Sequence, residues 1–223
     1  MLKFDALDRR LIPYVRTALT EGRVADRKFS PIYTAQCGLW TYDAESTPAK
    51  HGGFDSYFDK GLPEGVAIRP LSQSDAELVN ERWEYKSDTS LGMVRKMIRN
   101  SEEEHGGCVG LFVDGKLASW VCRYLDGTLG MLFTESDCRR RGYAGLVLAA
   151  AVSDCRRRRA LMTAKGKISS VGDAGDVMVS YIVETNDASK NLYSKVGWKR
   201  VADAAWVGFA SRKREDVKFS CMN

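Results

Sequence analysis

Three strand-like segments follow one another closely in the middle of the chain, and they constrain the fold more than any other feature does. They read CVGLFVDG, KLASWVCRYL and GTLGMLFTE, and the first two are joined by Asp114-Gly115. An Asp-Gly pair between two strand-like runs is a strong signal for a tight hairpin turn. The three segments therefore predict an antiparallel meander.

Helical and strand-like patterns lie on both sides of the meander. A short strand, VAIRPL, and two helical segments over residues 72–85 and 87–100 precede it. A long apolar helix beginning at Tyr143, the strand-like VMVSYIVET, a short helix that stops at Gly197 and a last strand follow it. This order predicts an α/β fold in which the meander leads into a helix crossover.

The N-terminal region has a less regular pattern. It holds an amphipathic helical segment at the start, the strand-like FSPIYTAQCGLWTYD, and a stretch rich in turn formers over residues 44–65. We expect residues 1–64 to be an N-terminal extension or a reduced companion domain, and residues 65–223 to be the main domain.

Composition and charge exclude several classes of protein. Lys and Arg number 34 against 29 Asp and Glu, and the net charge of +5 attracts phosphate-bearing ligands without requiring nucleic acid. The six cysteines include no C-x-x-C pair and the histidines number 2, so we expect reduced thiols and no metal site. The reduced thiols indicate an intracellular, cytoplasmic protein, and a mitochondrial location stays open. Because no apolar run approaches membrane-spanning length, we expect no membrane contact.

Residues 137–145 read DCRRRGYAG and lie between the last strand of the meander and the long helix. The N-terminus of a helix presents unpaired N–H groups and the positive end of the helix dipole, so it stabilises an anion. Glycine lets the backbone approach a ligand closely, and arginine adds charge-assisted contacts to phosphate. The stretch therefore predicts a cradle for a phosphate or pyrophosphate group.

Two blocks of the sequence resemble one superfamily. Residues 139–144 resemble the acyl-CoA signature Q/R-x-x-G-x-G/A of the GCN5-related N-acetyltransferases, abbreviated GNAT. The segment NDASKNLYSKVGW resembles that superfamily's second block, N-x-x-A-x-x-L-Y-x-K-x-G-F. Over residues 66–210 the chain is similar to the glycine N-acyltransferase-like branch.

This resemblance implies a fold and an activity. The fold is a mixed, mostly antiparallel sheet with a splay between its fourth and fifth strands, flanked by helices. The activity is that of an N-acyltransferase, which moves an acetyl or longer acyl group from acyl-CoA to the amine of glycine or another amino acid by direct attack. The implied partner is thus a small-molecule amine, and we expect a monomer or a homodimer with no nucleic acid.

The resemblance also implies where acyl-CoA lies. Its pyrophosphate lies on the backbone of residues 139–145, and its pantetheine arm runs between the strands that splay apart, pairing with exposed backbone groups as an added strand would. The residues expected to contact acyl-CoA are Leu132, Phe133, Thr134, Arg139, Arg140, Arg141, Gly142, Tyr143, Ala144, Gly145, Asn186, Ser189 and Tyr193.

Tyr193 matches the tyrosine that acts in this superfamily as general acid toward the departing thiolate. A phenol suits that role because its ordinary pKa, about 10, lies near that of a leaving thiol. Where relatives commonly carry a glutamate base, this chain has Thr128, which accepts no ammonium proton. Asp126, acting through a water molecule, is the candidate base; Glu135, Glu184 and water alone are the alternatives.

The identity of the acceptor stays open on the sequence alone. Arg82, Lys86 and Ser87 lie where acceptor pockets are often built in this fold, and each suits a substrate carboxylate. Glycine favours a basic pocket, whereas a lysine or a polyamine favours an acidic one. The alternatives are therefore an amino-acid acyltransferase, an acetyltransferase for a protein N-terminus, lysine or polyamine, and an acyl-CoA-binding protein with weak catalysis.

Overall fold

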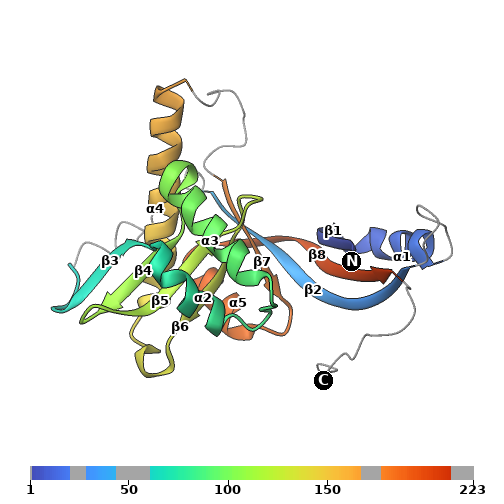
Figure 1. Cartoon of the computed structure of the whole chain (residues 1–223), viewed down its shortest axis with the longest axis horizontal. Coiled ribbons are helices and arrows are strands. Elements are labelled where there is room, and N and C mark those ends of the chain that lie inside the picture. The colour runs from blue at the N-terminus through green and yellow to red at the C-terminus, as the bar shows by residue number, and fades with distance from the viewer. Residues whose placement is uncertain (1, 21–28, 44–60, 167–176, 212–223) are drawn as a thin grey trace. The chain divides into compact units, whose positions relative to one another are not determined.

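The structure of the protein is a computed structural model that describes residues 2–20, 29–43, 61–166 and 177–211 (Figure 1). Its strands form one mostly antiparallel eight-stranded sheet, in the order β1-β8-β2-β7-β6-β5-β4-β3. The chain divides into two compact units, the smaller with residues 1–39, 183–185 and 201–223 and the larger with residues 40–182 and 186–200. Whether residues 1–64 act as a domain of their own stays a prediction.

The smaller unit begins with a strand where the sequence predicts helix. Strand β1 (Leu2–Asp8) pairs antiparallel with β8 (Lys199–Ser211), and the helix α1 is confined to Ile12–Thr20. Pairing with a distant strand overrides the helical pattern of the first residues. The strand β2 (Phe29–Asp43) covers the whole strand-like run expected there. The buried core of the smaller unit consists of residues from α1 and β8: Leu19, Ala205, Val207 and Phe209.

The larger unit contains the predicted meander. It consists of β4 (Val109–Val113), β5 (Lys116–Arg123) and β6 (Leu129–Thr134), each antiparallel to the next, and the short strand expected before it, β3 (Val66–Pro70), pairs antiparallel with β4. Both residues of the Asp114-Gly115 turn have positive φ, 48° and 78°, as a tight hairpin turn requires. Strand β7 (Val177–Val183) then joins β6 in parallel.

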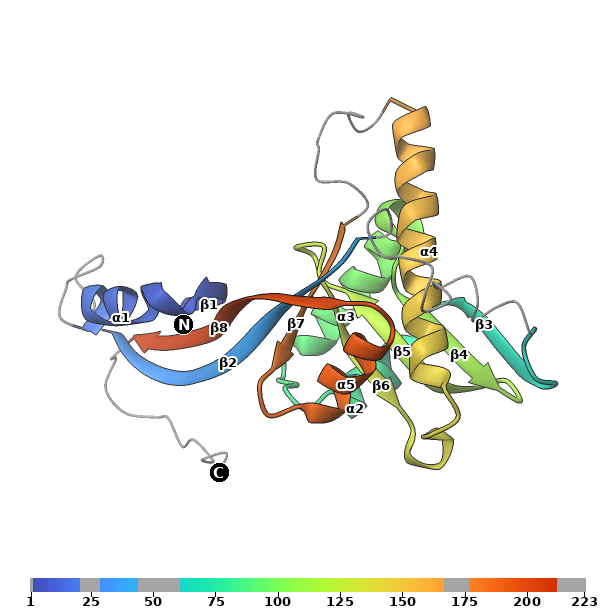
Figure 2. The same ribbon diagram turned by 180° about the vertical axis from the view of Figure 1, so that it is seen from behind.

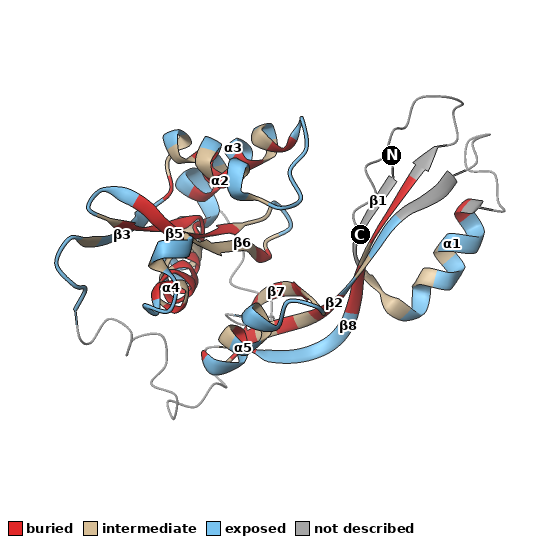
Figure 3. Ribbon diagram, turned by 90° about the horizontal axis from the view of Figure 1, so that it is seen from below, coloured by how far each residue is buried: buried red, intermediate tan, exposed pale blue. Residues whose placement is uncertain are grey.

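Helices cover both faces of this meander. Figure 3 shows α2 (Ala76–Arg82) and α3 (Ser90–Asn100) on one face and α4 (Tyr143–Ala164) on the other. The view from behind in Figure 2 shows α5 (Asp187–Lys195) on the α4 side, and Tyr193 of α5 shares a buried cluster with α4. Among the described residues, no helix is long and apolar enough to cross a membrane.

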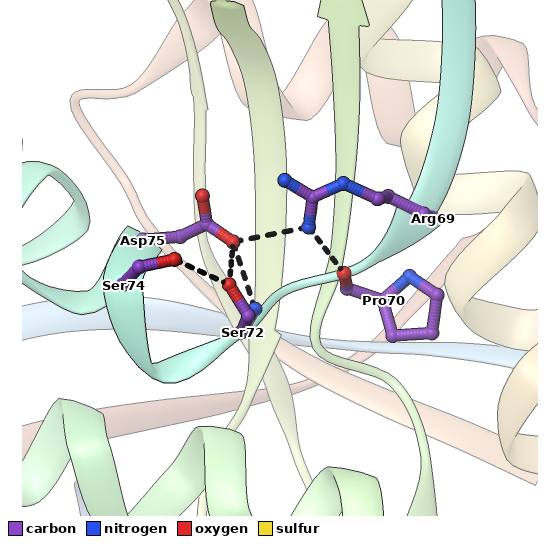
Figure 4. Close-up of polar contacts among 5 residues, drawn as sticks. All are labelled: Arg69, Pro70, Ser72, Ser74 and Asp75. Carbon is purple, nitrogen blue, oxygen red and sulfur yellow. Dashed lines mark hydrogen bonds and ion pairs between the residues drawn. The ribbon is translucent and has the colours of Figure 1, made fainter. Parts of the chain in front are cut away.

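A capping box begins the 3-10 turn Gln73–Asp75, which leads directly into α2 (Figure 4). The carboxylate of Asp75 accepts from the backbone N–H of Ser72 at 2.8 Å and from its hydroxyl at 2.7 Å. Arg69 of β3 donates to the same carboxylate at 3.2 Å and to the carbonyl of Pro70 at 3.0 Å. The contacts fix where the chain leaves β3 and turns into the helical layer. The turn-rich residues 44–65 lie mostly outside the described residues.

Candidate active site

The turn between β6 and α4 begins with an arginine held against the strand end. A short 3-10 turn, Ser136–Cys138, leads to Arg139, whose Nε donates to the carbonyl of Thr134 at 3.1 Å. Its guanidinium lies 5.8 Å from the centre of the Phe133 ring. Arg139 is therefore a structural tie between the turn and β6, with part of its donor capacity already used.

The next two arginines are available to a ligand. Arg140 and Arg141 are exposed and make no hydrogen bond or ion pair with the described residues. Arg140 has a φ of 62°, which is uncommon for a residue other than glycine and is typical of functional turns. Two cationic side chains thus stand unpaired beside the start of α4.

The first turn of α4 leaves backbone donors open. Gly142 is the N-cap with a φ of 82° and supplies no side-chain cap. The backbone N–H groups of Gly145 and Leu146 donate to the Gly142 carbonyl, whereas those of Tyr143 and Ala144 have no acceptor within the helix. A methyl group built on Gly142 meets nothing within 4 Å, so a ligand oxygen has room at the turn. The residues present fit a pyrophosphate group, with Tyr143 contributing its backbone, because its side chain is buried in the core.

Strands β6 and β7 meet at one point and then part. The register between them is a single parallel pair, Leu129 with Ser180, whereas β5 pairs with β6 from Leu129 to Thr134. The expected splay between the fourth and fifth strands of the superfamily's sheet is therefore confirmed. Beyond this pair, β6 has no ladder with β7 among the described residues. Of the backbone at Leu132, Phe133 and Thr134, the Phe133 carbonyl accepts from Ser119 on the β5 side and the Thr134 carbonyl accepts from Arg139, so only part of it is open to a partner strand.

A bulge lies within the stretch of β6 that has no ladder with β7. The β5 register shifts between Trp120 and Cys122, and Met131 has a φ of 52°, so Met131 and Leu132 together oppose one residue of β5. A bulge leaves one residue outside the ladder and turns its backbone groups away from the partner strand. An N–H released in this way suits an oxyanion, and the sequence pattern gave no sign of the bulge.

Tyr193 lies at the point where β6 and β7 meet. Its phenol oxygen is 3.2 Å from the Ser180 hydroxyl, and its ring packs edge-on against Trp198 with centroids 4.9 Å apart. Burial raises the pKa of Tyr193 to about 12, an effect that the Ser180 hydrogen bond opposes. The phenol therefore stays protonated at neutral pH, as an acid must before it donates.

Asn186 and Ser189, both expected to contact acyl-CoA, are joined at the start of α5. The side-chain oxygen of Asn186 accepts from the backbone N–H of Ser189 at 3.0 Å. This is the helix-capping role that asparagine favours. The cap fixes the register of α5, on which Tyr193 depends. Contacts of both residues with acyl-CoA stay predictions.

Asp126 and Thr128 form one local unit before β6. The Asp126 carboxylate accepts from the backbone N–H of Thr128 at 2.9 Å and from its hydroxyl at 2.8 Å, in the manner of an Asx turn. Both bonds use the same carboxylate oxygen, Oδ1. Asp126 is exposed, and its second oxygen faces no donor within the described residues.

A cavity of about 200 Å³ lies beside Asp126. Asn100, His105, Arg123, Tyr124 and Asp126 are among its lining residues. Arg123 donates to the carbonyls of Gly127 at 3.1 Å and His105 at 2.8 Å. The π-helical turn Ser101–His105 borders the cavity, and such turns are frequent at functional sites. In the described part of the chain, Tyr193 and Asp126 do not share one cavity: Tyr193 lies in the core on the α4 side.

The remaining expected site residues are mostly engaged by neighbours. Arg82 donates to Glu135 at 2.9 Å, so this alternative base is ion-paired. Lys86 donates to the carbonyl of Glu81 at 2.9 Å. The backbone N–H of Ser87 donates to the Ser90 hydroxyl at 2.9 Å. These contacts shape the link between α2 and α3 and leave fewer free cations there for a substrate carboxylate.

Metal ligation has no candidate among the described residues, which contain no cluster of three or more His, Cys, Asp or Glu side chains. The five described cysteines are free thiols, and Cys221 and His51 lie outside the described residues. Burial raises the pKa of Cys37 and Cys155 to about 11, which makes both poor nucleophiles.

Ser180 is a site residue that the sequence reasoning missed. It is buried, at 1% exposure, and it occupies an inward position of β7 between Met178 and Ile182. A single polar residue in the inward, apolar register of an alternating strand is the signal that points to it.

Comparison with known proteins agrees with this architecture. The sequence model of the FR47-like protein family matches residues 108–168, the span from the start of β4 through β5, β6, the arginine turn and α4. No curated protein sequence matches the chain significantly.

Solved structures share the fold. A Drosophila structural-genomics protein is 22% identical with a TM-score of 0.64, covering 92% of this chain and 59% of its own. A GCN5-related N-acetyltransferase from Sphaerobacter thermophilus is 13% identical with a TM-score of 0.56, and the match covers 95% of this chain and 60% of that protein. A tandem GNAT protein from the clavulanic acid biosynthesis pathway is 11% identical with a TM-score of 0.53, and the match covers 95% of this chain and 64% of that protein. The chain thus has the GNAT fold, and it spans less than two thirds of the length of these three proteins.

Proposed function

We propose that the chain is an acyl-CoA-dependent N-acyltransferase that moves an acyl group to the amine of a small amino acid. The observation that carries the proposal is the parting of β6 and β7 directly before the open N-terminus of α4, with a protonated tyrosine where the strands meet. An exposed strand edge, an anion cradle and a proton donor are the three parts that acyl transfer from a thioester requires.

The donor binds along β6 in this proposal. The pyrophosphate of acyl-CoA lies on the N–H groups of the first turn of α4, and Arg140 and Arg141 pair with its oxygens. The pantetheine amides pair with the backbone of residues 132–134 as an added strand does. The thioester then lies near the bulge at Met131.

The chemistry is a direct attack of the amine on the thioester carbon. The C–N bond forms, the carbonyl oxygen gains negative charge beside a backbone N–H of the bulge, and the C–S bond then breaks. The leaving sulfur takes the proton of Tyr193, and the amine nitrogen loses one proton to solvent. The products are an N-acyl amino acid and free CoA thiol.

The acceptor enters at the other end of β6, where the cavity of about 200 Å³ lies. Asp126 provides one carboxylate and Arg123 one guanidinium, a balance that suits a zwitterion rather than a polyamine. Asp126 relays the ammonium proton through water, because its Oδ2 is the carboxylate oxygen that Thr128 leaves unused. We expect a monomer or homodimer in solution.

A second candidate is an acyl-CoA-binding protein with weak catalysis. The separation of Tyr193 from the cavity beside Asp126 favours it, because an acid and a base that act in one step normally reach the same reacting centre.

The test is a free-thiol assay with acetyl-CoA and longer acyl-CoAs against amino acids, polyamines and a peptide N-terminus. We expect thiol release that depends on one amino acid, with the N-acyl product identified by mass spectrometry. Release with polyamine or peptide alone would contradict the proposed acceptor. Acyl-CoA binding by calorimetry without thiol release would leave the second candidate.

A further inference from the structure

The Ser180 hydroxyl joins three elements at the point where β6 and β7 begin to part. From its place in β7 it donates to the carbonyl of Leu129 in β6 at 2.8 Å, and its oxygen lies 3.2 Å from the phenol oxygen of Tyr193 in α5. All three residues are at most 2% exposed. A polar group so deeply buried is fixed in orientation, because each alternative rotamer leaves an unpaired oxygen.

The direction of the second bond matters for chemistry. The serine hydroxyl has one hydrogen and the Leu129 carbonyl can only accept, so the protonated phenol of Tyr193 donates to the Ser180 oxygen. Once the phenol has lost its proton, the Ser180 hydroxyl can turn and donate to the phenolate, which a hydrogen bond to the charged form stabilises. The same contact therefore aims the phenol and favours the loss of its proton.

We propose that Ser180 is a positioning residue for Tyr193, holding the phenol at the meeting point of β6 and β7 and stabilising the phenolate that remains after proton transfer. This inference rests on the proposed function. In the step concerned, the proton moves from the Tyr193 oxygen to the CoA sulfur as the C–S bond breaks. The phenolate keeps the electron pair and accepts a hydrogen bond from Ser180, until solvent returns a proton.

The first test does not depend on turnover. Fluorotyrosine placed at position 193 lowers the phenol pKa into a range that the folded protein tolerates, and its fluorine NMR signal is followed against pH. We expect the titration midpoint to rise by about one pH unit in Ser180→Ala, because a bond to a charged group is lost. Ser180→Cys keeps the volume with a weaker donor, and a smaller rise in the same direction is expected should Ser180→Ala fail to fold.

Ser90→Ala is the matched control. Ser90 is also buried, at 4% exposure, and its hydroxyl lies within hydrogen-bond distance of the Asn80 side chain, at 2.6 Å, and of the Ser87 carbonyl, at 2.8 Å. Its loss destabilises the protein without touching Tyr193. A midpoint that does not move in Ser180→Ala, or that moves equally in Ser90→Ala, overturns the proposal.

The second test is a double-mutant cycle on kcat. We expect Ser180→Ala to lower kcat about 10-fold on its own and to add nothing in a Tyr193→Phe background, because it acts through the phenol. Additive losses would overturn the proposal. If wild type releases no thiol with any acceptor, the proposed function fails, while the fluorine titration still decides the role of Ser180.

Discussion

The two long edges of β6 are bonded very differently. Along the β5 edge the ladder runs from Leu129 to Thr134, and the Ser119 hydroxyl adds a bond to the carbonyl of Phe133 at 2.8 Å. Along the β7 edge there is one pair, and the Ser180 hydroxyl bonds the carbonyl of Leu129 at the same 2.8 Å. A buried serine thus bonds to each edge of β6, but a strand ladder accompanies that bond only on the β5 edge.

This difference separates stability from binding within one strand. An unpaired strand edge normally invites aggregation, and proteins cover or shorten it. Here the edge opens beside a cationic turn, which favours an anionic ligand over a second strand. We therefore expect changes on the β7 edge to affect turnover and binding, and changes on the β5 edge to affect stability.

The largest expected effect is a loss of turnover, from a change at Tyr193, where β6 and β7 meet. Tyr193→Phe should lower kcat about 100-fold, because general-acid assistance to the leaving thiolate is lost, with acyl-CoA affinity changed by less than about threefold. Steady-state thiol release and calorimetry measure the two quantities. Tyr42→Phe is the control, since Tyr42 is also buried and packs against the same Trp198 at 5.9 Å. An equal loss in both variants would mean that the effect is one of packing.

The next effect concerns the cationic turn at the end of the open edge. Arg140→Ala and Arg141→Ala should each raise the Kd for acyl-CoA about 10-fold, since each removes a charge-assisted contact to phosphate. Calorimetry at two salt concentrations should show a weaker salt dependence in both variants. Arg157→Ala, in α4 and paired with Asp154 at 2.6 Å, should bind as wild type does. Tight binding that survives both changes would place the phosphate elsewhere.

Ser119→Ala tests the closed edge. The change removes the donor to Phe133 and should lower the free energy of unfolding by about 1 kcal/mol, measured by chemical denaturation. We expect kcat to change by less than about threefold. A large loss of turnover at unchanged stability would show that the β5 edge is part of the catalytic site.

The smallest effect is a pH dependence of stability. The pKa of Tyr193 is raised from 10.0 to about 12 in the folded state, so its contribution is complete below pH 10 and is lost as pH rises from 10 to 12. Between neutral pH and about pH 10.5, the free energy of unfolding should fall more in wild type than in Tyr193→Phe, and the difference should be under about 1 kcal/mol. Tyr14→Phe, at a site 73% exposed, should follow wild type. Parallel curves for all three proteins would mean that the phenol is not buried in solution.

Local signals in the sequence predicted the meander, the helices and the arginine turn, because each depends on residues close together in the chain. The Asp114-Gly115 turn and the Gly142 cap carry their own conformational signature. Strand β1 was not predictable in this way, since its pairing with β8 joins the two ends of the sequence. The tie between Ser180 and Tyr193 depends likewise on which strands meet, and the bulge at Met131 depends on the register with β5.

The single meeting point of β6 and β7 also bears on how the chain folds. Leu129 and Ser180 are 51 residues apart, whereas the strands of the meander are joined by short turns. Closing a long loop before its contacts form is entropically unfavourable, so distant pairs tend to form after local ones. During synthesis, the meander and α4 are complete before β7 leaves the ribosome. Strand β7 is then added to a folded meander, so the strand pair to which we assign acyl-CoA is completed only after the meander has folded.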